Sequence, residues 1–253
     1  MEHLNLFYRG AYTNTVYTCR YDGHNWTGNT SIISQPGNIA VVSPFNPSPV
    51  EFNNRIYLFY RANEGPELCC AWYDGTRWHG GQPIHTMNGG INPKSNHSPN
   101  VTVYRSTIFL TYLDPQGYDV YTAWFDGTKW GGNTKISSQN GGITPRSTVN
   151  PAICTYKDQL YIVYPGEWTG NLYSAWFNGA YWDGNTEIAD QPGDISPASS
   201  YTPGIGVYEN RLIIVYLGAH LNNLYSASFN GSEWSGNTKI SDQPGGISPK
   251  SEY

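Results

Sequence analysis

One sequence unit recurs along this 253-residue chain at a constant interval of 52 residues. A tryptophan marks each copy: Trp26, Trp78, Trp130, Trp182 and Trp234. An Asp-Gly or Asn-Gly dipeptide begins four residues before every one of these tryptophans, and no insertion or deletion interrupts the register. A fixed period of this length is typical of repeat architectures, in which each unit packs against the next one along the chain.

Each unit contains four strand signals separated by turn residues. In residues 151–188 these are the runs PAICTY, LYIVY, LYSAWF and YWDGNTEI. The Asn178-Gly179 step between the last two runs predicts a type I′ hairpin turn, in which both central residues have positive φ. The chain holds 9 Trp, 21 Tyr and 8 Phe with 28 Gly and 17 Pro, as expected for aromatic-rich strands that end at turns. The sequence therefore predicts an all-β protein, a five-bladed β-propeller of four-stranded antiparallel blades.

The length adds one detail to this architecture. We expect a single propeller domain over 1–253, with sequence repeats 4–54, 55–106, 107–158, 159–210 and 211–253. Five complete units would need 260 residues, and the seven absent residues correspond to the innermost strand of the unit that begins at Leu4. We therefore expect one blade of three strands, or a homo-oligomer in which a neighbouring chain covers the gap.

Charge and cysteine usage exclude several classes of protein. The net charge is −5 and the 14 Lys and Arg residues are scattered, so no basic stripe is available for nucleic acid. No apolar run is long enough to enter a membrane and the start lacks a signal-peptide pattern, which predicts a soluble protein, cytoplasmic or released by a non-classical route. Cys19, Cys69, Cys70 and Cys154 lack zinc-site spacing and are interpreted as small core residues, and no metal or cofactor is expected.

The regularity of the repeat also argues against catalysis. An enzyme needs one unique constellation of acid, base or nucleophile, and many of the carboxylates here fall at repeated turn positions such as Asp22, Asp74 and Asp126. We therefore predict a non-enzymatic protein and nominate no catalytic residue. Equal repeats suit the presentation of one weak binding site several times.

The repeat shows two resemblances to known families, one structural and one that implies a carbohydrate ligand. The [DN]-G-x-x-W hairpin resembles a shortened Asp-box hairpin of sialidases, which is a structural feature there, so the hairpin tryptophans are interpreted as packing residues. Repeats reading LYSAWFNGAYWDGNTEI resemble those of the β-propeller lectins, and five copies most resemble the tachylectin family of N-acetylhexosamine-binding lectins. The resemblance implies a multivalent lectin, a hemagglutinin whose partners are mono- or oligosaccharides on glycoconjugates.

The candidate sugar-binding residues fall on the face that carries the seven-residue loops and the links between blades. The repeat offers there a tyrosine (Tyr60, Tyr112, Tyr164, Tyr216), a serine (Ser95, Ser147, Ser199), a cation (Lys94, Arg146, Lys250) and an aromatic position (His97, Tyr201). Aromatic rings stack on sugar faces and polar side chains bond sugar hydroxyls. The structural alternative is that tyrosine and serine tie the link to the blade.

Two further groups of residues complete the candidate site. Loops that vary on a constant scaffold commonly carry recognition, which singles out Glu167, Trp168 and His220. Trp72, Trp124 and Trp176 share a position that other units fill with Arg20 and Ser228, which indicates either binding or packing between blades. A protein-interaction propeller is the first alternative function, and a five-bladed glycoside hydrolase ranks below it.

Overall fold

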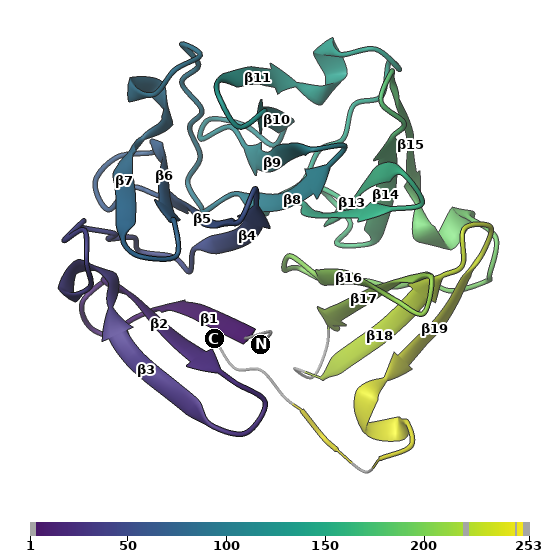
Figure 1. Ribbon diagram of the computed structural model, residues 1–253. Coiled ribbons are helices and arrows are strands. Elements are labelled where there is room, and N and C mark those ends of the chain that lie inside the picture. Colours follow the sequence, from purple (N-terminus) through teal and green to yellow (C-terminus); the bar gives the residue numbers. More distant parts are fainter. Residues whose placement is uncertain (1–3, 220–222, 246, 250–253) are drawn as a thin grey trace. The chain divides into compact units, whose positions relative to one another are not determined.

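Antiparallel sheets make up the fold (Figure 1). The structure is a computed structural model of the chain and describes residues 4–219, 223–245 and 247–249. The fold class is the predicted one, an all-β five-bladed β-propeller, and its blades are meanders in which strands pair in chain order. No helix among these residues is long and apolar enough to cross a membrane.

The first sheet has three strands, among the residues described, and the other four sheets have four strands each. The first sheet contains β1 (Leu4–Arg9), β2 (Val16–Tyr21) and β3 (Trp26–Ser31). The second contains β4 (Ser48–Phe52), β5 (Arg55–Arg61), β6 (Leu68–Tyr73) and β7 (Trp78–Pro83). The third contains β8 (Asn100–Tyr104), β9 (Thr107–Leu113), β10 (Val120–Phe125) and β11 (Trp130–Lys135). The fourth contains β12 (Ala152–Tyr156), β13 (Gln159–Pro165), β14 (Leu172–Phe177) and β15 (Trp182–Glu187). The fifth contains β16 (Gly204–Tyr208), β17 (Arg211–Leu217), β18 (Leu224–Phe229) and β19 (Trp234–Lys239).

Within the part of the chain that the structure describes, the first sheet has no counterpart of the inner strands β4, β8, β12 and β16, and it is the three-stranded blade that the sequence predicts. A 3₁₀ turn follows the last strand of every sheet: η1 (Ile32–Ser34), η2 (Ile84–Thr86), η3 (Ile136–Ser138), η4 (Ile188–Asp190) and η5 (Ile240–Asp242). The isoleucines that open η1 to η4 are fully buried. The end of each sheet is therefore held by an apolar side chain.

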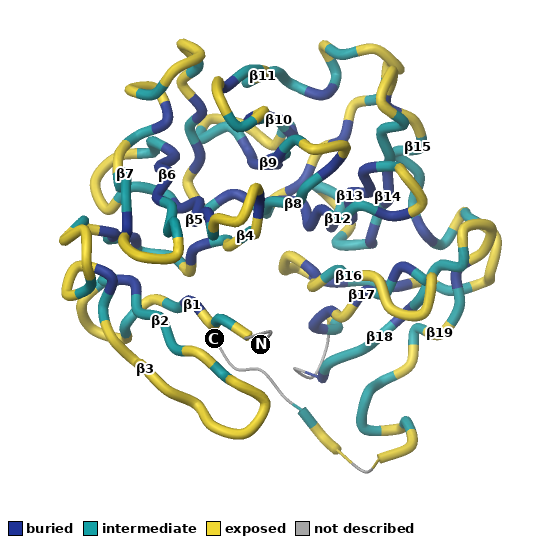
Figure 2. Tube along the Cα trace, viewed as in Figure 1, coloured by how far each residue is buried: buried dark blue, intermediate teal, exposed yellow. Residues whose placement is uncertain are grey.

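The chain forms two compact units, Met1–Pro115 with Ala123–Asn133 and Gln116–Thr122 with Thr134–Tyr253. Figure 2 shows buried residues along β5 and β6 in the first unit and along β13 and β14 in the second. Both faces of these central strands are covered, so apolar residues follow one another without the alternation of a half-exposed sheet. Cys69 and Cys70 are buried within β6, and all four cysteines are free thiols, in agreement with the sequence interpretation.

The Asp-Gly turns differ from the predicted type I′ geometry. Of the pair Asp74-Gly75, only Gly75 has a positive φ, at 97°. Asp74 Oδ1 instead accepts the backbone N–H groups of Thr76 and Arg77 at 2.8 and 2.9 Å, which closes a four-residue turn. The prediction failed because an aspartate side chain can bond the backbone two residues on and so replace the tight turn.

The four hairpins between the two inner strands do have two consecutive residues with positive φ. These pairs are Asn53-Asn54, Arg105-Ser106, Lys157-Asp158 and Glu209-Asn210. This is the backbone of a type I′ turn, which matches the twist of the strands on either side. The two-residue geometry is thus present in every four-stranded blade, two hairpins earlier than the sequence suggested.

A glutamine links three of the hairpin tryptophans to the preceding blade. The Trp78 indole N–H donates to Gln35 Oε1 at 3.0 Å, and the same bond joins Trp182 to Gln139 and Trp234 to Gln191. These three indoles are almost fully buried, as the packing interpretation predicts. Trp26 departs from this pattern, because half of its side chain is exposed.

Candidate functional site

The recurring tyrosines and serines of the loop face are buried. Tyr60, Tyr112, Tyr164 and Tyr216 are exposed by 3% or less, and Ser95, Ser147 and Ser199 are fully buried. The Tyr112 hydroxyl donates to Asn133 Oδ1 at 2.6 Å, and each serine Oγ accepts the backbone N–H two residues further on. Burial raises the pKa of Tyr60, Tyr164 and Tyr216, which keeps these hydroxyls protonated. This placement favours the structural alternative for most of these positions.

One pocket in the second unit gathers four of the candidate residues. Arg146, Tyr164, Glu167 and Trp168 line a cavity of about 220 Å³ together with Thr144, Gly166, Thr169, Tyr173 and Asn185. Tyr164 lies near the end of β13, the residues from Gly166 to Thr169 belong to the loop between β13 and β14, and Asn185 lies on β15. Isolated β-bridges join this loop to the links on either side of its blade. Gly166 pairs with Ser147 in the link before β12, and Asn171 pairs with Ala198 in the link after β15.

A bidentate ion pair forms one side of this pocket. Arg146 Nε lies 2.7 Å from Glu167 Oε2, and Arg146 Nη2 donates to Glu167 Oε1 at 3.1 Å. The Glu167 side chain is only 3% exposed, whereas that of Arg146 is 49% exposed. Two parallel charge-assisted bonds fix the carboxylate in one orientation. The pocket therefore holds an oriented carboxylate under a cation that is open to solvent.

A second ion pair stands beside the first. Lys135 Nζ lies 2.7 Å from Asp119 Oδ2, and the Asp119 backbone forms a β-bridge with Arg146. The hydrogen bond to Asp119 and the charge of that carboxylate raise the pKa of Lys135. Charges of both signs thus alternate along this part of the loop face, which suits a ligand with many hydroxyl groups.

Two aromatic rings flank the ion pair. Trp168 is 85% exposed, and its ring centroid lies 6.3 Å from that of Tyr118. Arg146 Cζ lies 5.9 Å from the Tyr118 centroid, in cation–π geometry. Because a large exposed indole next to a pocket contributes little to folding, it is a candidate platform for a ligand.

The opposite wall of the pocket is a stack of two tyrosines. The rings of Tyr164 and Tyr173 lie 6.0 Å apart with an interplanar angle of 19°. The Tyr173 hydroxyl donates to Glu187 Oε2 at 3.2 Å, and Asn171 Nδ2 donates to Glu187 Oε1 at 2.7 Å. Gly166 lets this wall approach the loop, because a Cβ there would lie 2.7 Å from the Tyr173 ring.

The three candidate tryptophans of the middle strands lie outside this pocket. Trp72 stacks on His79 at 5.5 Å and on Tyr57 at 6.3 Å, and Trp176 stacks on Tyr161 at 6.0 Å. Trp124 covers Gly131, where a Cβ would lie 2.2 Å from the indole. These contacts support the packing interpretation.

The remaining candidates are scattered over other blades. Lys94 Nζ lies 3.8 Å from Glu67, and Tyr201 is partly exposed. His97 packs against Phe45 at 4.8 Å, and its pKa is lowered by burial and by the Arg61 charge. His220 and Lys250 lie outside the described residues.

Sequence reasoning missed several residues near the pocket: Asp119, Lys135, Tyr173, Asn185 and Glu187. Glu187 carried a usable signal, because the equivalent positions of the repeat hold Ser31, Pro83, Lys135 and Lys239. A carboxylate that occurs in one unit alone marks a break in the repeat. Within the described ranges, no group of three or more His, Cys, Asp or Glu side chains could hold a metal ion.

No protein-family model matches this chain, and no curated protein matches it significantly. Solved structures do match. The chain is similar to a family 117 glycoside hydrolase of the marine bacterium Zobellia galactanivorans, with a TM-score of 0.52 and 12% identity over 81% of this chain and 71% of the enzyme. It is also similar to an exo-β-1,3-galactanase of Phanerochaete chrysosporium solved with galactose, with a TM-score of 0.54 and 12% identity over 94% of this chain. The chain spans about half (54%) of the galactanase structure.

These comparisons confirm the five-bladed propeller and contradict the functional prediction. The sequence was interpreted as a multivalent, non-enzymatic lectin, with a glycoside hydrolase ranked last. That interpretation is wrong, because the two matching structures described above are glycoside hydrolases. The near-perfect repeat concealed Glu187, which differs from its equivalents in the other units, and Arg146 and Glu167 were singled out as sugar-binding residues and not as catalytic ones.

Proposed function

We propose that this chain is a glycoside hydrolase whose site is the pocket of Arg146, Tyr164, Glu167 and Trp168. The observation that carries the proposal is the buried carboxylate of Glu167, oriented by two bonds from Arg146 beside an exposed indole. The likeness to a galactanase and to a family 117 glycoside hydrolase supports it.

The pocket suits a single sugar ring. Its volume of about 220 Å³ lies below the range of about 300–1,000 Å³ that is typical of sites for drug-sized ligands. Trp168 offers an apolar face for the C–H face of a sugar, while Arg146, Thr169 and Asn185 offer polar groups for its hydroxyls. The substrate class that fits is a neutral glycan whose terminal residue enters the pocket.

Glycoside hydrolysis uses two carboxyl groups with different roles. Glu167 is held in one orientation by two bonds from Arg146, so we assign it the role of base or nucleophile. We assign the acid role to Glu187, whose carboxylate accepts hydrogen bonds from Asn171 and from the pocket residue Tyr173. Asp119 is the weaker candidate for this role, since its carboxylate is held by Lys135.

The test is hydrolysis of a panel of neutral glycans, namely β-1,3-galactan, arabinan, xylan and agarose oligosaccharides. Released reducing ends are measured, and products are identified by mass spectrometry. We expect one class to be cleaved, and we expect Glu167→Gln and Glu187→Gln each to reduce kcat by about 10²–10⁴, the contribution of acid–base groups.

Asp183→Asn is the matched control, because Asp183 is an exposed carboxylate on the same strand as Glu187 and should leave kcat unchanged. Trp168→Ala should raise KM about tenfold and leave kcat nearly constant, as expected for a ring that binds the ground state and the transition state equally. Binding of these glycans without turnover, or full activity of Glu167→Gln, would contradict the proposal.

A further inference from the structure

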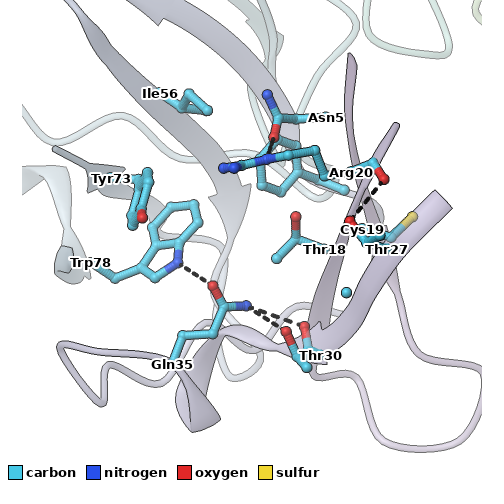
Figure 3. A pocket seen from close by; sticks show the side chains of 12 residues that line it. Asn5, Thr18, Cys19, Arg20, Thr27, Thr30, Gln35, Ile56, Tyr73 and Trp78 are labelled. Carbon is cyan, nitrogen blue, oxygen red and sulfur yellow. Dashed lines mark hydrogen bonds between the residues drawn. The ribbon is translucent and has the colours of Figure 1, made fainter. Parts of the chain in front are cut away.

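Two repeat-equivalent cavities in the first unit differ in chemistry. The first, between β2 and the hairpin of Trp78, has a volume of about 230 Å³ and is drawn in Figure 3. Its walls carry the polar side chains Asn5, Arg20 and Gln35, and Gln35 bridges Trp78 and Thr30. The second cavity lies one repeat further on and has a volume of about 400 Å³.

The second cavity lacks the glutamine of the first. Met87 stands 52 residues after Gln35, at the position that Gln139 and Gln191 hold in later units. In those units the glutamine accepts the indole N–H of the tryptophan 43 residues further on, and for Met87 that residue is Trp130. Both Met87 and Trp130 line the cavity. Trp130 therefore stands in the wall of the same cavity as the residue that replaces the glutamine.

This N–H is a buried donor without an acceptor. Trp130 is 2% exposed, and its Nε1 has no hydrogen-bond partner among the residues that the structure describes. A buried donor left unpaired is costly, and buried polar groups are paired in most native proteins. A ligand oxygen in the cavity would remove this cost.

The rest of the wall has an aromatic part and a polar part, and the polar part consists of Arg55, Gln82, Thr86, Asn88 and Thr128. The Tyr57 and Phe125 ring centroids lie 5.9 Å apart, and Trp72 stacks on Tyr57. Trp72 stands where the first cavity has Arg20, so the second cavity is more apolar at this position and at Met87. A charged group would lose its hydration against the aromatic part of the wall, whereas a neutral ring would not.

We propose that the cavity lined by Tyr57, Trp72, Met87, Phe125 and Trp130 is a binding site for a small uncharged aromatic molecule with a carbonyl oxygen. The ring packs against Trp72, Tyr57 and Phe125, and the oxygen accepts the indole N–H of Trp130. This site is separate from the pocket of Glu167 and does not depend on the proposed hydrolase activity.

The probe for this site is acetophenone, with ethylbenzene as the ring of similar shape that lacks the acceptor. Binding is measured by isothermal titration calorimetry and by saturation-transfer NMR on the full chain. We expect saturable binding of acetophenone and about fivefold weaker binding of ethylbenzene, the ratio that one net hydrogen bond provides.

Two variants at Met87 decide whether the indole N–H is responsible. Met87→Gln introduces the residue that the four other units have at this position, so it should fold, satisfy Trp130 and weaken acetophenone binding at least tenfold. Met87→Leu is the matched control, since leucine fills a similar volume without an acceptor, and its affinity should stay within twofold of the parent protein. The proposal is overturned if acetophenone shows no saturable binding at millimolar concentration, or if Met87→Gln binds it as well as Met87→Leu does.

Discussion

Replacing Gln191 with methionine removes one hydrogen bond between two blades of the second unit and two further bonds within the fourth sheet. Gln191 Oε1 accepts the Trp234 indole N–H at 3.0 Å, and Gln191 Nε2 donates to Ser174 Oγ and to the Thr186 carbonyl, both at 2.9 Å. Methionine has a similar length and no strong acceptor, so the substitution changes the bonding while it largely preserves the packing.

The cost follows from the burial of these groups. Trp234 is 1% exposed, and a buried donor left unpaired costs about 1–3 kcal/mol. The two lost donor bonds contribute about 0.5–1.5 kcal/mol each. We therefore expect Gln191→Met to lower the free energy of unfolding by about 3 kcal/mol, which for a chain of this size corresponds to a Tm lower by about 6–12 °C.

The assay is urea unfolding followed by tryptophan fluorescence and by far-UV circular dichroism. Met87→Gln is the reciprocal variant, because it supplies Trp130 with the missing acceptor, and it should raise the free energy of unfolding by about 1 kcal/mol. The reasoning is refuted if Gln191→Met lies within 0.5 kcal/mol of the parent protein.

Three further predictions concern turns, close backbone contacts and thiols. Hydrogen bonds from backbone N–H groups of its turn lower the pKa of Asp126 from 3.8 to about 2, so its contribution to stability is present above pH 3.8 and is lost as the pH falls through 2. The urea midpoint should therefore fall between pH 5 and pH 2, and by less in Asp126→Asn, which keeps the turn acceptor but cannot titrate. Gly141→Ala should unfold the chain or make it insoluble, because a Cβ there would lie 1.8 Å from the Trp182 carbonyl oxygen, whereas Gly142→Ala has open space and should cost only about 1 kcal/mol by thermal melting. Burial and the nearby Glu67 charge raise the pKa of the Cys69 thiol to about 12, so this thiol should resist a disulfide reagent at pH 8 in the native protein and react after unfolding in urea.

Several features of the fold follow directly from sequence. Four of the hairpin tryptophans that were predicted as packing residues are buried: Trp78, Trp130, Trp182 and Trp234. The first sheet has three strands among the described residues, as the register of the repeat predicts. These predictions succeed because a strand and its turn are set mainly by residues close together in the sequence.

The turn type was harder to predict. Asp74 and Gly75 match the signal of a two-residue hairpin, but the Asp74 carboxylate closes a longer turn. Lys157 and Asp158, which carry no strong turn signal, form the hairpin with two positive φ values. Several local conformations were available at each position, and the register of the flanking strands selected one of them.

The candidate site was predicted only in part. Arg146, Tyr164, Glu167 and Trp168 were each singled out from the sequence, and the structure brings these four together in one pocket. The roles assigned to them changed, because the sequence emphasised what the repeats share. Glu187 was missed for that reason.

The sequence by itself determined the number of units, the strands in each unit and the positions of the turns, because the 52-residue period and the alternation of aromatic and turn residues are local properties of the chain. Only the tertiary structure decided which side chains meet. Arg146 and Glu167 are 21 residues apart, and Met87 and Trp130 are 43 residues apart, so their contacts depend on how loops and blades pack. Equivalent tryptophans can therefore differ in hydrogen bonding: Trp234 donates to Gln191, whereas Trp130 has no acceptor among the described residues. The cost of a buried polar group depends on the neighbours that packing places around it.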